Sequence, residues 1–145
     1  RLEPPLGEGT PECPDVFQIG DTYYLIHSPS AGTTDMRYAT DIRGPYRPPE
    51  SATIDTPILY AAKRMHDGKR HVLTGWIRDL RGFKDRGGWE WGGTQSVPRE
   101  AVEGTDGELW FKPVDEALAV FTRTHFEGQP RVEPGAPWSL EVPAH

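Results

Sequence analysis

Apolar and polar residues alternate along this chain in short runs, and clusters of glycine, proline and aspartate separate the runs. Alternation with a period of two predicts half-buried β-strands. The predicted strands are residues 15–19, 22–28, 35–40, 53–65, 70–78, 92–98 and 108–112. Short antiparallel strands with a turn about every ten residues are typical of propeller blades. We therefore expect an all-β chain that forms about two adjacent four-stranded blades.

The turn signals between these runs support the same organisation. Gly20-Asp21 joins the first two runs into a hairpin, and residues 66–69 (His-Asp-Gly-Lys) join a second pair. The best helical segment, residues 113–121, is short. We expect residues 1–121 to form one domain portion and residues 122–145, which hold four prolines, to be a linker or the start of a following β module.

Composition favours a folded, strand-rich chain. The 15 prolines and 16 glycines are too many for long helices, while five Trp, five Tyr and five Phe argue against disorder. The net charge of −6 and the absence of a basic stripe argue against a nucleic-acid partner, and no apolar run is long enough to cross a membrane. The single cysteine, Cys13, excludes an internal disulfide and a thiolate zinc site.

The most conspicuous candidate for chemistry is Glu12, which lies where an irregular lead-in becomes a strand. Pro14 favours extended geometry at Cys13, so the backbone beneath the carboxylate is expected to be constrained. Two interpretations follow: an acid aimed into a cleft, or a solvated acidic turn. On a regular strand, Asp15 would point to the opposite face, about 10 Å along.

Three segments resemble glycoside hydrolase family 32, the invertases, inulinases and levanases. Glu12-Cys13-Pro14-Asp15 resembles the family's E-C-P-D motif. Gly75-Trp76, followed by residues 92–100 (GGTQSVPRE), is similar to its G-W and GG-x-x-S-x-PRE segments. Residues 55–61, which begin with Asp55 and end with Tyr-Ala, are similar to its D-x-x-x-x-YA segment. The resemblance covers residues 10–115, with the segments in the family's order.

The resemblance implies a partial five-bladed β-propeller leading into a β-sandwich, and a retaining reaction on β-fructofuranosidic bonds of the sucrose, inulin or levan type. Glu12 matches the general acid/base of this reaction, in which a second carboxylate attacks the sugar. The family's nucleophile motif, N-D-P-N-G, and its R-D-P motif do not occur here. We therefore expect these residues to be the C-terminal half of a catalytic domain, inactive by itself and dependent on N-terminal blades.

Other residues are candidates for substrate binding or support. Cys13 matches the family's cysteine and either fills space or keeps water away from the neighbouring acid. Asp15 is expected to accept backbone or arginine hydrogen bonds that hold the loop. Asp55, Trp89 and Trp91 are candidates for sugar contacts. The plainer interpretation of Asp55 is a turn residue, and that of the two tryptophans is packing in the core.

Three functions remain open at this stage. The first is a β-fructofuranosidase part of family 32 type, and the second is a related propeller glycosidase of the family 43 or 68 kind. The third is a noncatalytic carbohydrate-binding module. No metal or cofactor is expected, because His66 and His71, which flank one turn, lack a nearby carboxylate cluster. In each case the expected partner is a sugar, a fructose-containing oligo- or polysaccharide for the first function.

Overall fold

The computed structural model describes residues 1–6, 11–29, 33–54, 58–77, 94–105 and 107–121. The chain divides into two compact units, Arg1–Val114 and Asp115–His145. The described residues contain eight strands and one four-residue helix. The all-β expectation is therefore confirmed for this part of the chain.

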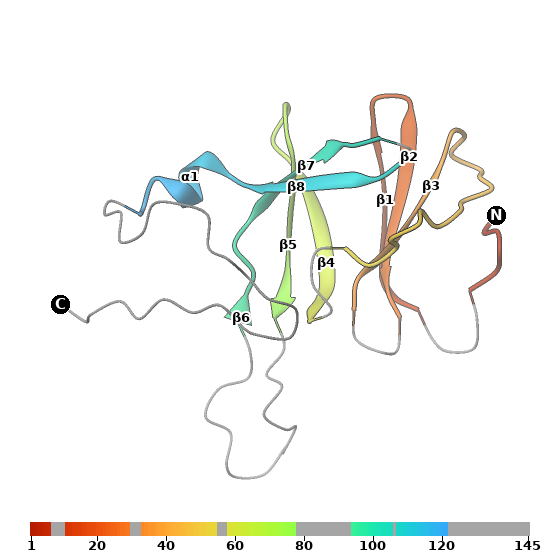
Figure 1. The fold of residues 1–145 in the computed structure, drawn as a ribbon, viewed down its shortest axis with the longest axis horizontal. Coiled ribbons are helices and arrows are strands. Elements are labelled where there is room, and N and C mark those ends of the chain that lie inside the picture. Colours follow the sequence, from red (N-terminus) through yellow and green to blue (C-terminus); the bar gives the residue numbers. More distant parts are fainter. Residues whose placement is uncertain (7–10, 30–32, 55–57, 78–93, 106, 122–145) are drawn as a thin grey trace, which may run out of the picture. The chain divides into compact units, whose positions relative to one another are not determined.

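The first sheet is an antiparallel meander in the order β1-β2-β3 (Figure 1). Its strands are β1 (Glu12–Ile19), β2 (Thr22–Ser28) and β3 (Asp35–Ala39). The predicted β1–β2 hairpin turns at Gly20, whose φ of 57° lies in the region that favours glycine. Beyond β3, Arg47 and Thr53 form isolated bridges to Tyr38 and Asp35 and continue the sheet at its outer edge.

The second sheet has the order β4-β5-β7-β8, and β6 pairs with β5 (Figure 1). Its strands are β4 (Leu59–His66), β5 (His71–Ile77), β6 (Thr94–Gln95), β7 (Arg99–Glu103) and β8 (Leu109–Pro113). The β4–β5 hairpin turns at Asp67, whose carboxylate accepts hydrogen bonds from the backbone N–H groups of Lys69 and Arg70. These bonds lower the pKa of the Asp67 carboxyl well below its usual range.

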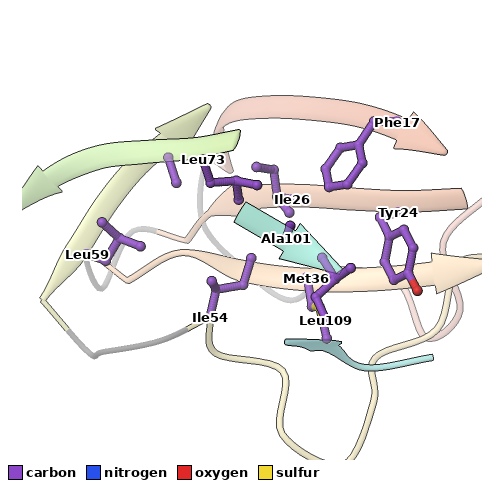
Figure 2. Packing of buried hydrophobic residues seen from close by; sticks show 10 residues of the cluster. Phe17, Tyr24, Ile26, Met36, Ile54, Leu59, Leu73, Ala101 and Leu109 are labelled. Carbon is purple, nitrogen blue, oxygen red and sulfur yellow. The ribbon is translucent and has the colours of Figure 1, made fainter. Parts of the chain in front are cut away.

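The hydrophobic core lies between the two sheets, and Figure 2 shows the side chains of both converging on it. The first sheet contributes Phe17, Tyr24, Ile26 and Met36, and the second contributes Leu59, Ala62, Leu73, Ala101 and Leu109. Tyr24 and Ile26 are 0% exposed. Full burial of one such side chain is worth roughly 1.5–3 kcal/mol, so the apolar contact between sheets is a main source of their stability.

Three strand predictions need correction. The first strand begins at Glu12, three residues before its predicted start, because the chain already pairs with Ser28 of β2 at that point. The predicted strand 53–65 begins only at Leu59, and Ile54 instead donates its N–H to Thr34 O in the first sheet. The predicted strand 92–98 is replaced by the short β6 and by β7, which starts after Pro98. Proline has no N–H to give to a ladder, so the strand resumes only beyond it.

The second unit is described only to Phe121 and contains the single-turn helix α1 (Asp115–Leu118). The expected linker or β module at residues 122–145 lies outside the described residues. Within the described part of the chain, no helix is long and apolar enough to span a membrane.

Candidate functional site

A β-bulge lies directly beneath Glu12. In the β1–β2 ladder Glu12 pairs with Ser28 and Asp15 pairs with Ile26, so three steps on β1 oppose two on β2. Cys13 takes up the extra residue with a φ of 52°, a left-handed conformation rare for residues with a Cβ. The expectation that Pro14 would hold Cys13 extended is therefore wrong, because bulge geometry determines its backbone conformation.

The bulge also changes the direction of Asp15. Directly opposed residues share a face, and Ser28 and Ile26 are two positions apart on β2. The register therefore places Glu12 and Asp15 on the same face of the first sheet, the face that turns toward the second sheet. The regular-strand prediction of opposite faces is wrong, because the extra residue shifts the alternation by one.

The second sheet repeats this bulge at the matching point of its first strand. Tyr60 pairs with Trp76 and Lys63 with Thr74, again three steps against two, and Ala61 has a φ of 54°. In this repeat Tyr60 takes the place that Glu12 has in β1. The two sheets thus share a structural device although their sequences at the bulges differ.

Hydrogen bonds between the sheets lock the two bulges together. Ser28 Oγ accepts the N–H of Ala61 at 2.9 Å, a group that the bulge removes from its own ladder. Thr34 Oγ1 donates to the Leu59 carbonyl at 3.0 Å and also accepts a longer bond from the N–H of Ala62. Because Ser28 and Thr34 are 0% exposed, water cannot replace these bonds.

Two further hydrogen bonds join the second sheet to the bulge of the first sheet. Asp15 Oδ2 accepts the backbone N–H of Arg64 at 2.9 Å, and Lys63 Nζ donates to the Pro14 carbonyl at 2.8 Å. Asp15 therefore does accept a backbone hydrogen bond, from a strand of the second sheet. Together these contacts hold the backbone on which Glu12 stands.

The Glu12 side chain is exposed, and among the described residues nothing forms a hydrogen bond or an ion pair with its carboxylate. On this restrained backbone, the protonated carboxyl group can donate a proton and the carboxylate can accept one. Cys13 beside it is a free, half-buried thiol.

Tyr60 and Trp76 form an aromatic pair at the corresponding level of the second sheet. Their ring centroids are 5.9 Å apart at an interplanar angle of 73°, an edge-to-face arrangement. Gly75 allows the close packing at this bulge, because a Cβ there would lie 2.8 Å from Leu59 Cδ1 and 3.0 Å from both Ala62 Cα and the Tyr60 carbonyl oxygen.

The residues of the GGTQSVPRE segment that are described contact their own sheet. Ser96 Oγ accepts the N–H of Gly75 at 3.0 Å, which ties the segment to β5. Glu100 forms an ion pair with Lys112 at 3.0 Å.

Three sequence-predicted site residues, Asp55, Trp89 and Trp91, lie outside the described residues. Among the described residues, no group of three or more His, Cys, Asp and Glu side chains could hold a metal ion. His66 and His71 do face each other, with ring centroids 4.6 Å apart.

Sequence reasoning missed Ser28, Thr34 and Tyr60. Ser28 and Thr34 are small polar residues at strand ends, and nothing in their local sequence distinguishes them from turn residues. Tyr60 was part of the third resembling segment, but its equivalence to Glu12 depends on the ladder registers and appears only in the fold.

No protein-family model matches the sequence. Solved structures of glycoside hydrolase family 32 share its fold. An enzyme of this family from Bifidobacterium adolescentis aligns over 73% of this chain and 19% of its own, with 24% identity and a TM-score of 0.55. A family 32 β-fructofuranosidase from Bombyx mori aligns over 78% of this chain and 27% of its own, with 19% identity and a TM-score of 0.58.

A mutant of the Bombyx mori enzyme in complex with sucrose aligns over 72% of this chain, with 18% identity and a TM-score of 0.50. The chain therefore has a family 32-like glycoside hydrolase fold, and its two sheets are blades of the propeller. It spans only about a fifth to a quarter of the length of these proteins.

Proposed function

We propose that this chain supplies the acid/base part of a retaining glycoside hydrolase that cleaves β-fructofuranosidic bonds. The observation that carries the proposal is the Glu12 carboxylate, which is exposed on a strand start restrained by two interlocked bulges. The likeness to family 32 structures supports the assignment at the level of the fold.

In the proposed reaction Glu12 protonates the leaving oxygen while a second carboxylate attacks the anomeric carbon. Glu12 then removes a proton from the water that hydrolyses the covalent intermediate. Asp15 is not assigned the nucleophile role, because its Oδ2 already accepts the N–H of Arg64 between the blades. The proposal places the nucleophile in another part of the protein, beyond the residues of this chain.

The proposed substrate is a fructose-containing sugar of the sucrose, inulin or levan type. The support comes from the solved neighbours, one a β-fructofuranosidase and another a mutant bound to sucrose. Tyr60 and Trp76 are proposed to border the sugar site, because they lie at the level of Glu12 in the next blade. Further sugar contacts are proposed for Asp55, Trp89 and Trp91. Support of the Glu12 acid is proposed for Cys13 and Asp15.

The test is Glu12→Gln in the full-length enzyme. Turnover of sucrose or a fructan should fall by roughly 10² to 10⁴, the usual contribution of a general acid. The loss should be smaller for an activated aryl fructoside, whose leaving group needs little protonation. Azide should partly restore the second step, since it needs no general base.

Glu50→Gln is the matched control, because Glu50 is an exposed glutamate of the same blade away from the bulges. The two variants should have the same thermal stability. Near-normal activity of Glu12→Gln on the natural sugar would remove Glu12 from the catalytic role and leave the noncatalytic interpretation.

A further inference from the structure

A small cavity of about 180 Å³ lies between the outer edges of the two blades. Its apolar wall is formed by Met36, Ile54, Leu109 and Phe111. Its polar wall is formed by Ser51, Thr53 and Glu108. Figure 2 labels three of the apolar residues, Met36, Ile54 and Leu109, which lie together where the two sheets meet.

The first polar wall is held in place by the backbone. Met36 donates its N–H to Ala52 O and Ile54 donates to Thr34 O, each at 2.8 Å, so the segment carrying Thr53 runs as an extra strand beside β3. Thr53 Oγ1 donates to Asp35 Oδ1 at 3.1 Å. The proton of this hydroxyl is thereby engaged, and its oxygen is left to accept from a ligand.

The opposite polar wall is Glu108, in the turn between β7 and β8. Its N–H donates to Thr105 O at 3.0 Å, and its carbonyl accepts the N–H of Gly104 at 2.9 Å. Its carboxylate forms no hydrogen bond or ion pair with any other residue that the structure describes. A carboxylate on a fixed turn is therefore available to accept two hydrogen bonds from a ligand.

This cavity is separate from the Glu12 site. Glu12 stands on β1, the first strand of its sheet, whereas Thr53 pairs beyond β3 at the other edge. Three strand spacings of 4.7–4.9 Å put the two positions about 14 Å apart across the sheet. The opposite side of the cavity is formed by Glu108, in the turn before β8, and by residues of β8, the strand farthest from β4 in its sheet.

The geometry points to a second, noncatalytic sugar site in this cavity that takes one neutral monosaccharide unit. A sugar ring has an apolar C–H face, which matches Phe111 and the buried Met36 and Leu109. Its vicinal hydroxyls are donors and acceptors, which matches the carboxylate of Glu108 and the hydroxyls of Ser51 and Thr53.

The volume decides how much of a sugar fits. A cavity of about 150 Å³ in another protein accommodates a benzene ring, whereas sites for larger ligands measure about 300–1,000 Å³. The observed 180 Å³ therefore suits one six-membered or five-membered ring, such as the end unit of an oligosaccharide. With so few contacts, the expected dissociation constant is about millimolar.

The test is titration of the protein with D-glucose and D-fructose, followed by calorimetry and by ligand-observed NMR. Glu108→Gln should weaken binding about ten-fold, because a charge-assisted hydrogen bond is lost. Ser51→Phe, which places a ring at an exposed rim position, should abolish binding. Glu50→Gln, one residue from Ser51 and not in the cavity wall, should bind like the wild type.

Glu12→Gln distinguishes binding in the cavity from binding at the catalytic site. This variant should leave binding in the cavity unchanged. Binding that falls in Glu12→Gln and persists in Glu108→Gln would assign the sugar to the catalytic site and overturn the inference. The absence of binding at 100-fold above the expected constant, about 100 mM, would also overturn it. So would preferential binding of a small amine such as ethylamine, since a cation would then be the ligand of Glu108. Failure of the fructosidase proposal would leave this site standing, because its test measures binding and not turnover.

Discussion

Cys13 and Ala61 both adopt a left-handed backbone conformation, with φ values of 52° and 54°. This conformation brings Cβ close to the following carbonyl and costs an L-residue roughly 1–2 kcal/mol. Each residue sits at the bulge of the first strand of its blade, and the two bulges bond to each other through Ser28 and Asp15. At these matching positions, each strained residue directly follows the side chain before its bulge, Glu12 in β1 and Tyr60 in β4.

Ala61→Gly should stabilise the protein by up to about 1 kcal/mol, because glycine removes the Cβ strain. Part of this gain is offset, because glycine also increases the conformational entropy of the unfolded chain. Ala62→Gly is the matched control, since Ala62 is 1% exposed and φ there is not positive. The control should lose about 1–2 kcal/mol through lost burial and added chain entropy. Urea unfolding of both variants measures the two effects, and a loss of stability in Ala61→Gly would contradict the strain.

At the element scale, a hydrogen bond between β2 and β4 connects the strand that pairs with Glu12 to the next blade. Ser28 faces Glu12 across the β1–β2 ladder and accepts the N–H that the β4 bulge leaves free. One buried hydroxyl thus joins the acid's strand to the next blade.

Ser28→Ala should cost about 1–3 kcal/mol of stability, because the buried N–H of Ala61 loses its acceptor. Turnover should fall as well, since the backbone under Glu12 loses a restraint. Ser51→Ala, at an exposed serine, should change stability by less than about 0.5 kcal/mol. Denaturant unfolding and turnover are measured on the same preparations. Equal stability of the two variants would mean that the Ser28 hydrogen bond does not contribute to the free energy of unfolding.

At the scale of the whole molecule, the packing of the blades buries His27 and partly buries His71. His27 is 5% exposed, and burial lowers its pKa below 6.5, with Arg37 adding to this and Asp35 opposing it. The pKa of His71 is also lowered, first by partial burial and then by its electrostatic interactions with His66 and Arg64. Both groups bind protons more weakly in the folded chain than in the unfolded chain.

Stability should therefore be independent of these groups above about pH 7 and should fall as the pH drops below about 6.5. The unfolded chain takes up the protons first, so acid favours unfolding. His27→Gln should reduce the slope of stability against pH between pH 7.5 and 5.5, and His27→Gln combined with His71→Gln should reduce it further. Thermal unfolding at each pH measures the slope. A slope that is unchanged in the double variant would assign the acid sensitivity to other groups.

Much of the fold was predictable because it depends on short-range patterns. Alternation of apolar and polar residues and the Gly20 and Asp67 turns predicted β2, β3, β5 and β8 closely, and β1 except for its first three residues, since a strand with one buried face must alternate. Glu12 was found as a candidate because a carboxylate beside a proline at a strand start is a local feature. The strand boundaries at Leu59 and Arg99 were not predictable from the local sequence, because pairing partners far along the chain determine them.

The sequence by itself determined the class of the chain, its hairpins and the identity of its candidate acid. Only the tertiary structure decided the two bulges, the shared face of Glu12 and Asp15, and the burial of Ser28 and Thr34 between the blades. A bulge is a mismatch of register between two strands, and its free N–H finds its acceptor in another sheet. Neither strand carries that information in its own residues, so the geometry of the site became visible only when the blades were packed together.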